Sequence, residues 1–207
     1  MKVKLNIETW NRKEHFLFFK QMEEPFFGLT TTVDCTKAYD KAKELNVSFF
    51  TYYLHKTLVA VNAIENFKYR IIGDEVFIFD QINVSSTIMR EDNTFGFSFM
   101  EYDSDINVFA KNTSEEIERV RNTPGLLTRE FNDPNLIHFS TLPWMNFTSV
   151  SHARGFNYPD SCPKFSFGKI MEENGKKTMS ISVHVHHGLV DGFHVGQFLQ
   201  HLQELLS

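Results

Sequence analysis

The sequence predicts an α/β fold, a two-layer sandwich in which one mixed β-sheet is covered by helices. Segments with helical periodicity alternate along the 207 residues with segments rich in β-branched and aromatic residues. Two pairs of strand-like segments are separated only by short turns, which indicates hairpins and therefore antiparallel neighbours in the sheet. No repeat, low-complexity tract or Pro/Gly/Ser-rich linker interrupts the chain. We therefore expect a single domain over residues 1–207.

Five segments carry apolar residues at helical spacing. The last one places Phe198, Leu202 and Leu206 on one face, and Asp191 stands where a side chain can cap its start. In chain order, the predicted helices are 10–21, 37–45, 48–64, 106–121 and 192–206.

The predicted strands are short segments rich in Val, Ile, Thr, Phe and Tyr. A Gly73-Asp74 turn joins the second strand to the third, and the run Glu173-Asn174-Gly175-Lys176 joins the last two. In chain order, the predicted strands are 26–34, 69–72, 76–79, 82–90, 94–102, 136–141, 164–171 and 178–186.

The composition excludes several classes of protein. Hydrophobic residues make up 42% and charged residues 23%, which is ordinary for a globular domain and unlike a disordered or collagen-like chain. A formal net charge of −5 argues against a nucleic-acid partner. The first ten residues alternate charged and apolar, unlike a signal peptide, and no segment is apolar enough to cross a membrane. Cys35 and Cys162 lack a nearby cysteine partner, so we expect reduced thiols and a cytoplasmic location.

Phenylalanine is unusually frequent, with 22 Phe beside 15 Leu. Such an excess indicates either an aromatic core or an aromatic pocket, and composition alone does not choose between them.

Histidine is concentrated at the end of the chain, where five of the nine lie in the final 24 residues. His184, His186 and His187 occupy a corner between a predicted strand and a predicted helix. His184 and His186 share a strand face as in some zinc sites, but no CxxC or HExxH supplies further ligands, and we expect no metal. A structural histidine and a general base are the other interpretations. A Ser-His-Asp triad is disfavoured, because GxSxG is absent and Asp191 follows His187 by only four residues.

Three segments together resemble one enzyme family. Residues 186–192 read His-His-Gly-Leu-Val-Asp-Gly, the HHxxxDG pattern of chloramphenicol acetyltransferases and dihydrolipoamide acyltransferases. Residues 10–16, Trp-Asn-Arg-Lys-Glu-His-Phe, and 142–149, Leu-Pro-Trp-Met-Asn-Phe-Thr-Ser, are similar to further segments of the chloramphenicol acetyltransferases. This resemblance runs through the whole chain. It implies the fold of CoA-dependent acyltransferases and a homotrimer with active sites between subunits.

The resemblance also implies roles for four residues. His187 would be the general base that deprotonates the acceptor hydroxyl, with acetyl-CoA as co-substrate and no permanently bound cofactor. Ser149 would donate a hydrogen bond to the oxyanion. Asp191 would pair with Arg12 and hold the histidine in place without transferring a proton.

The resemblance also implies which residues bind the substrates. Phe18, Phe27 and Phe95 fall at or near positions that line the family's aromatic acceptor pocket, although core packing is the favoured alternative for any single one of them. Ser166 stands where the family often has a threonine that supports the transition state. Lys169 is a candidate contact for CoA.

The chain departs from the family pattern at two places. Phe19 stands where well-known members have tyrosine, and residues 150–156 read Val-Ser-His-Ala-Arg-Gly-Phe where those members continue Phe-Asn-Leu-Asn. Both changes lie near the acceptor. The expected activity is acetyl-CoA-dependent O-acetylation of chloramphenicol, which confers antibiotic resistance. The alternatives are O-acetylation of a different hydroxyl compound and a non-catalytic trimeric ligand-binding protein.

Overall fold

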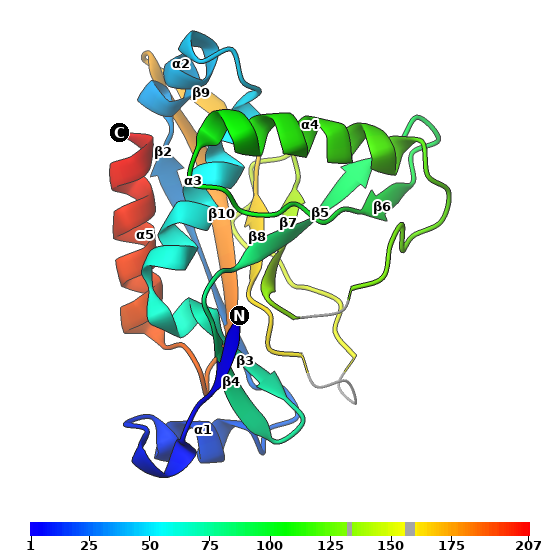
Figure 1. The fold of residues 1–207 in the computed structure, drawn as a ribbon. Coiled ribbons are helices and arrows are strands. Elements are labelled where there is room, and N and C mark those ends of the chain that lie inside the picture. Colours follow the sequence, from blue (N-terminus) through cyan, green and yellow to red (C-terminus); the bar gives the residue numbers. More distant parts are fainter. Residues whose placement is uncertain (132–133, 156–159) are drawn as a thin grey trace.

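The computed structural model describes residues 1–131, 134–155 and 160–207, and its centre is a mixed β-sheet (Figure 1). Within these residues the sheet has the order β2-β10-β8-β7-β5-β6, and β9 pairs with β10. β7 runs parallel to both β5 and β8, whereas the other neighbours are antiparallel. The strands are β2 (Phe26–Asp34), β5 (Asn83–Met89), β6 (Phe95–Phe97), β7 (Leu136–Thr141), β8 (Lys164–Phe167), β9 (Met171–Glu173) and β10 (Lys176–His186). A smaller antiparallel sheet contains β1 (Lys2–Lys4), β4 (Glu75–Phe79) and β3 (Tyr69–Ile72).

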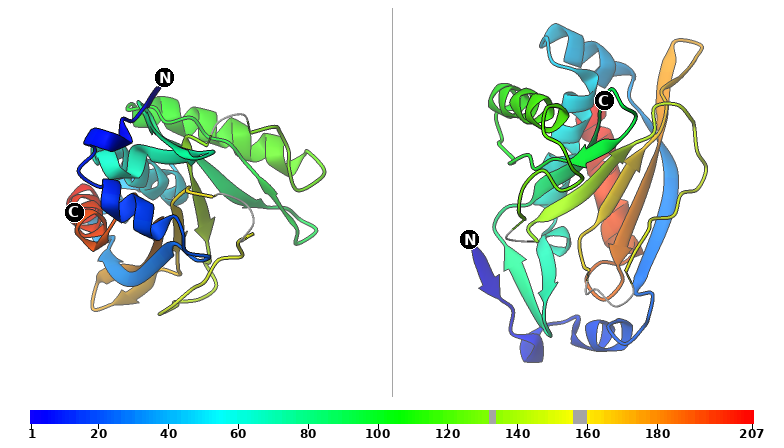
Figure 2. Two further views of the ribbon diagram at one scale, coloured as in Figure 1. Left: turned by 90° about the horizontal axis from the view of Figure 1, so that it is seen from below. Right: turned by 90° about the vertical axis from the view of Figure 1, so that its right-hand side faces the viewer.

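The larger helices lie together on one side of the sheet (Figure 2). α3 packs against α2, α4 and α5, and α5 also contacts β2. The helices are α1 (Lys13–Phe19), α2 (Thr36–Glu44), α3 (Phe49–Ala63), α4 (Ile106–Arg121) and α5 (Gly192–Leu206), with 3-10 turns η1 (Ile7–Thr9) and η2 (Glu65–Lys68). The predicted mixed sheet covered by helices is confirmed.

Side-chain alternation gives the sheet one apolar and one polar face. In β10, Ile181 and Val183 are fully buried in the core, whereas Ser182 and His184 point to the opposite side. In β8, the ring of Phe165 packs against Phe198 of α5, with centroids 5.1 Å apart. The apolar face therefore forms the core with the helices, and part of the polar face is covered by the segment that follows β7.

Most of the phenylalanine excess belongs to this core. Phe139 of β7 and Phe167 of β8 stack with centroids 5.2 Å apart, and Tyr53 of α3 lies against both rings. Phe67 and Phe109 are fully buried as well.

Several predicted boundaries are wrong. The first helix begins at Lys13 and not at residue 10, because Trp10 is extended and packs edge-on against Tyr69, with centroids 5.2 Å apart. The predicted strand 164–171 is interrupted after Phe167, where the backbone N–H of Lys169 donates to the carbonyl of Met145 at 2.8 Å.

Two further strand predictions also differ. The predicted strand 94–102 has its ladder only over Phe95–Phe97, followed by a single bridge between Met100 and Val84. β1 was not predicted. Its three exposed residues pair along the edge of β4, a contact that local pattern does not encode.

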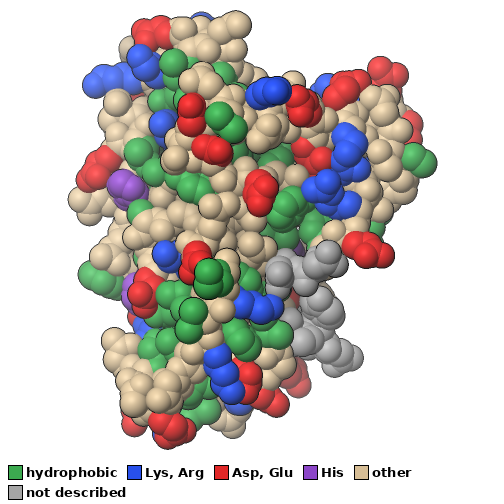
Figure 3. All heavy atoms as spheres, in the orientation of Figure 1, with side chains coloured by type: hydrophobic (Ala, Val, Ile, Leu, Met, Phe, Trp, Pro, Cys, Tyr) green, Lys and Arg blue, Asp and Glu red, His purple; other side chains and the backbone are tan. Residues whose placement is uncertain are grey.

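Charges of both signs are intermixed on the surface drawn in Figure 3, and its described residues form no broad basic patch there. In the described ranges, no helix combines the length and apolar character that a membrane crossing requires.

Candidate active site

His187 lies in the turn that joins β10 to α5. Its backbone N–H donates to the carbonyl of Pro25 at 2.8 Å, which ties the turn to the segment before β2. Asp191 then begins the helix, and its carboxylate accepts the backbone N–H of Phe193 at 3.0 Å. The turn is therefore fixed at both ends by hydrogen bonds.

Two aromatic rings hold the imidazole of His187. Phe19 of α1 stacks on it with centroids 4.0 Å apart and an angle of 9°, and Phe27 of β2 lies 4.5 Å away at 46°. Phe18 extends this surface, since its ring is 5.1 Å from Phe19 and 60% exposed. Nδ1 of His187 is buried and has no hydrogen-bond partner among the described residues. Nε2 is thus the ring nitrogen that can reach a substrate.

Arg12 connects the histidine turn to the helix cap. Its Nη1 lies 2.6 Å from Oδ2 of Asp191, and its Nη2 donates to the carbonyl oxygen of His187 at 3.3 Å. Burial by itself would raise the pKa of Asp191, but the hydrogen bond from Arg12 and the positive charge beside it hold that pKa below its usual value. The contact between Asp191 and Arg12 expected from the sequence is present.

Three other candidate residues lie apart from His187 within one chain. Ser149 is exposed in the segment after β7 and makes no hydrogen bond with the described residues. Ser166 is buried in β8, opposite Ser182 of β10 and Ser140 of β7. Lys169 is exposed just beyond β8.

A cavity of about 830 Å³ opens on the polar face of the sheet. Phe95, placed in the acceptor pocket from the sequence, lines it, whereas Phe18, Phe19 and Phe27 are not among its described lining residues. Its walls come from β3 and the turn after it, from β5, β6, β7 and β8, and from residues 152–155 and 160–162. The cavity includes the apolar residues Leu127, Phe97 and Phe131 and the hydroxyl residues Ser85, Thr87 and Ser140.

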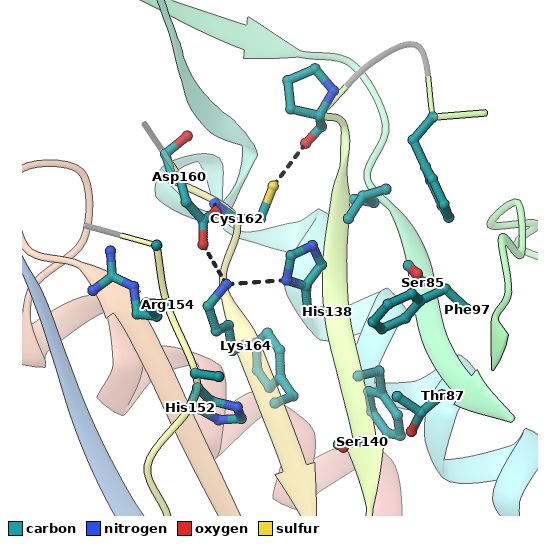
Figure 4. A pocket seen from close by; sticks show the side chains of 18 of the residues that line it. Ser85, Thr87, Phe97, His138, Ser140, His152, Arg154, Asp160, Cys162 and Lys164 are labelled. Atoms are coloured by element: carbon teal, nitrogen blue, oxygen red, sulfur yellow. Dashed lines mark hydrogen bonds and ion pairs between the residues drawn. The ribbon is translucent and has the colours of Figure 1, made fainter. Parts of the chain in front are cut away.

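Four basic side chains, His138, His152, Arg154 and Lys164, line the same cavity, and we call them the basic cluster. Figure 4 shows Lys164 between His138 and Asp160. Its ammonium lies 2.5 Å from Oδ2 of Asp160 and 3.1 Å from Nδ1 of His138, and the lysine side chain is only 6% exposed.

The pKa values of both histidines of the cluster are lowered, which favours their neutral forms at pH 7. Desolvation and the positive charge of Lys164 lower the pKa of His138. Burial, with His184 and Lys164 nearby, lowers the pKa of His152 to about 4. The two imidazoles are therefore hydrogen-bonding groups and not cations.

The basic cluster was not predicted from the sequence. A local signal did exist, because Lys164 and Ser166 alternate with core phenylalanines in β8, which marks a polar face on a central strand. His138 alternates with Ile137 and Phe139 in the same way. Of the atypical segment 150–156, residue 156 lies outside the described residues.

The other two histidines of the corner have structural contacts. The ring of His184 covers Gly28, where a Cβ would lie only 2.2 Å from Nε2, and His152 meets the same ring edge-on at 4.8 Å. Nδ1 of His186 accepts the backbone N–H of Gly188 at 3.1 Å. Residues 1–131, 134–155 and 160–207 contain no group of three or more His, Cys, Asp or Glu side chains arranged to hold a metal.

Comparison with known proteins identifies the family. The family model described as Chloramphenicol acetyltransferase matches residues 2–203. "Chloramphenicol acetyltransferase 3" of Escherichia coli is 30% identical over 206 residues, covering 99% of this chain and 96% of that protein. The relative from Proteus mirabilis, "Chloramphenicol acetyltransferase", is 29% identical and covers 97% and 92% of the two chains.

Solved structures of related proteins show the same fold. A chloramphenicol acetyltransferase superposes with a TM-score of 0.89 at 30% identity, over 100% of both chains. A probable dihydrolipoamide acetyltransferase from Listeria monocytogenes shares the fold with a TM-score of 0.67, at 17% identity over 99% of this chain and 93% of that one. The chain belongs to the chloramphenicol acetyltransferase family.

Proposed function

We propose that this protein is an O-acetyltransferase that transfers the acetyl group of acetyl-CoA to a hydroxyl of chloramphenicol and so inactivates the antibiotic. The observation that carries the proposal is the setting of His187. Its imidazole is held between Phe19 and Phe27. The turn that contains it is anchored by Arg12 and Asp191. A histidine fixed in this way with one free ring nitrogen suits proton abstraction from a hydroxyl.

The proposed reaction passes through one tetrahedral intermediate in a ternary complex. Nε2 of His187 takes the hydroxyl proton while the hydroxyl oxygen forms a bond to the thioester carbonyl carbon. Ser149 donates a hydrogen bond to the resulting oxyanion. The carbon–sulfur bond then breaks, and the imidazolium returns its proton to the sulfur of CoA. Asp191 and Arg12 position the base and transfer no proton.

We further propose that residues 1–207 act as one domain that assembles into a homotrimer with active sites between subunits. Support comes from the separation of the site components, because in one chain His187 contacts neither Ser149 nor the described lining of the cavity. A neighbouring copy would bring the two parts together, with Ser166 on the acceptor side and Lys169 toward acetyl-CoA. The enzyme would act in the cytoplasm, with acetyl-CoA as co-substrate and no permanently bound cofactor.

The test measures thiol release from acetyl-CoA by the purified protein with and without chloramphenicol. We expect release that depends on chloramphenicol, that falls by about 10²–10⁴ in His187→Ala and that falls by about 10²–10³ in Ser149→Ala. His201→Ala, in the exposed part of α5, is the matched control and should retain wild-type activity. Sedimentation equilibrium tests the trimer. Unchanged turnover in His187→Ala would contradict the assignment of the base.

A further inference from the structure

The cavity on the polar face contains hydrogen-bond donors that the protein leaves unused. A lysine ammonium has three N–H groups and can only donate. In Lys164 one of them bonds to Asp160 and a second bonds to Nδ1 of His138. Because Nδ1 accepts, the proton of this neutral imidazole resides on Nε2. The third N–H of Lys164 and the Nε2–H of His138 have no partner in the described ranges.

Two further polar atoms beside the cavity are buried without a hydrogen-bond partner among the described residues. They are Nε2 of His152 and Nε of Arg154. The guanidinium of Arg154 lies 3.6 Å above the ring of Phe26 and forms an ion pair with Glu24. These side chains are thus held in place by the protein, and their unpartnered atoms are enclosed and not exposed to the cavity.

The charged acceptor beside the cluster, Asp160, is already engaged, whereas the hydroxyls of Ser85, Thr87 and Ser140 in the cavity lining can donate or accept. Asp160 accepts Lys164 at Oδ2 and the backbone N–H of Cys162 at Oδ1, 2.9 Å away. The third N–H of Lys164 and the Nε2–H of His138 therefore lack an acceptor. A carboxylate suits these donors better than a neutral carbonyl, because it offers about four lone-pair sites and forms charge-assisted bonds.

The opposite wall of the cavity is largely aromatic, with the hydroxyls of Ser85 and Thr87 beside it. Phe95 and Phe97 of β6 lie with centroids 5.6 Å apart, and Phe131 completes the surface. Figure 4 shows Phe97 across the cavity from Lys164. A ligand that meets both walls has an aromatic or otherwise apolar body and a negatively charged group at one end.

We propose that this cavity selects hydroxyl acceptors that bear a carboxylate, which the basic cluster binds while the phenylalanine wall holds the body of the molecule. The inference rests on the proposed function, since it names the acceptor class of the same acetyl transfer. It also predicts that neutral acceptors, chloramphenicol included, gain less from these donors than a carboxylate does, because their oxygens carry no net charge.

The experiment compares para-(hydroxymethyl)benzoate with its methyl ester, which differ only in the anionic group. We expect kcat/KM for the carboxylate to exceed that for the ester by roughly tenfold or more. The double variant Lys164→Met with Asp160→Asn removes the ammonium without stranding a buried carboxylate, and should reduce the ratio to about one. Lys37→Met, at an exposed position of α2, is the matched control and should preserve it.

Direct binding gives a second readout that does not require turnover. Isothermal titration of the same two compounds should show tighter binding of the carboxylate to the wild-type protein and equal binding to the folded double variant. Equal affinities in the wild type, or an unchanged ratio in the double variant, would overturn the proposal even if chloramphenicol is acetylated. Absence of thiol release with every acceptor would refute the proposed function, and the titration would still decide the ligand class.

Discussion

Replacement of Asp191 by asparagine removes the ion pair with Arg12 and also the negative charge 2.8 Å from Nδ1 of His194. Asparagine is as good an N-cap as aspartate, so the hydrogen bond to the backbone N–H of Phe193 can persist and the start of α5 should stay intact. What the variant removes is the negative charge 2.6 Å from the guanidinium of Arg12. The side chain of Arg12 is 9% exposed, so its charge would be left almost unpaired inside the protein.

The expected loss of stability lies between two known limits. Removal of one partner costs about 3–5 kcal/mol for a fully buried pair and about 0–1 kcal/mol for an exposed one. Asp191 is 29% exposed, which places this pair between the limits, at about 2 kcal/mol. For a chain of this length, about 2 kcal/mol corresponds to a decrease in Tm of roughly 4–8 °C. Because Arg12 also bonds to the carbonyl of His187, kcat should fall by about 10- to 100-fold.

A double-mutant cycle gives the pairwise contribution. Urea unfolding of the wild type, Asp191→Asn, Arg12→Met and the double variant, at one protein concentration, should give a coupling free energy of about 1–2 kcal/mol. A coupling below about 0.3 kcal/mol, together with a wild-type Tm for Asp191→Asn, would refute the positioning role. Stability would then be independent of the pair, and any loss of activity would need another cause.

Three further predictions concern single sites. Gly28→Ala should destabilise the protein by about 1–3 kcal/mol in urea unfolding, because the new Cβ would overlap the ring of His184, whereas Gly196→Ala, on open helix surface, should stabilise it by about 0.5–1 kcal/mol. Phe19→Tyr should leave Tm unchanged and alter KM for the acceptor more than KM for acetyl-CoA, since the ring stays stacked on His187, the proposed base, and gains a hydroxyl; equal effects on both would contradict a place beside the acceptor. The lowered pKa of Asp191 stabilises the folded state above the unfolded pKa of about 3.9, and this contribution disappears as the pH falls through the folded pKa. The urea midpoint of the wild type should therefore decrease more steeply below about pH 4 than that of Asp191→Asn.

The elements that the sequence predicted best are those with strong local signals. The bounds of α4 and α5 agree with the predicted ranges 106–121 and 192–206, because each helix is amphipathic and begins after an aspartate whose carboxylate accepts a backbone N–H of the first turn. The N-terminal helix was predicted too long, because Trp10 has helical spacing but is recruited to the core from an extended segment. Local periodicity does not distinguish these two ways of burying a side chain.

For the site residues as well, local sequence signals predict little of what depends on long-range contacts. The partnership of Arg12 with Asp191 joins residues 179 positions apart, and it was expected only because the sequence resembles a known family. The basic cluster could not be predicted as a unit. It depends on the parallel register that places His138 beside Lys164, and on a segment after β7 that crosses the polar face. Both are long-range features that a single sequence does not specify.

The separation of His187 from Ser149 in one chain leads to a sharp test of where the active site forms. If each site takes its histidine from one subunit and its serine from the neighbour, His187→Ala and Ser149→Ala each lose nearly all activity alone but complement each other within a hybrid trimer. In hybrids assembled at random from equal amounts, roughly one quarter of the interfaces pair an intact histidine with an intact serine. Co-expression should therefore restore roughly one quarter of wild-type activity, whereas mixing the separately purified, stable oligomers should restore little. Activity of the co-expressed hybrids no higher than the sum of the two variants would place the histidine and the serine of each site in the same chain, or remove Ser149 from the reaction.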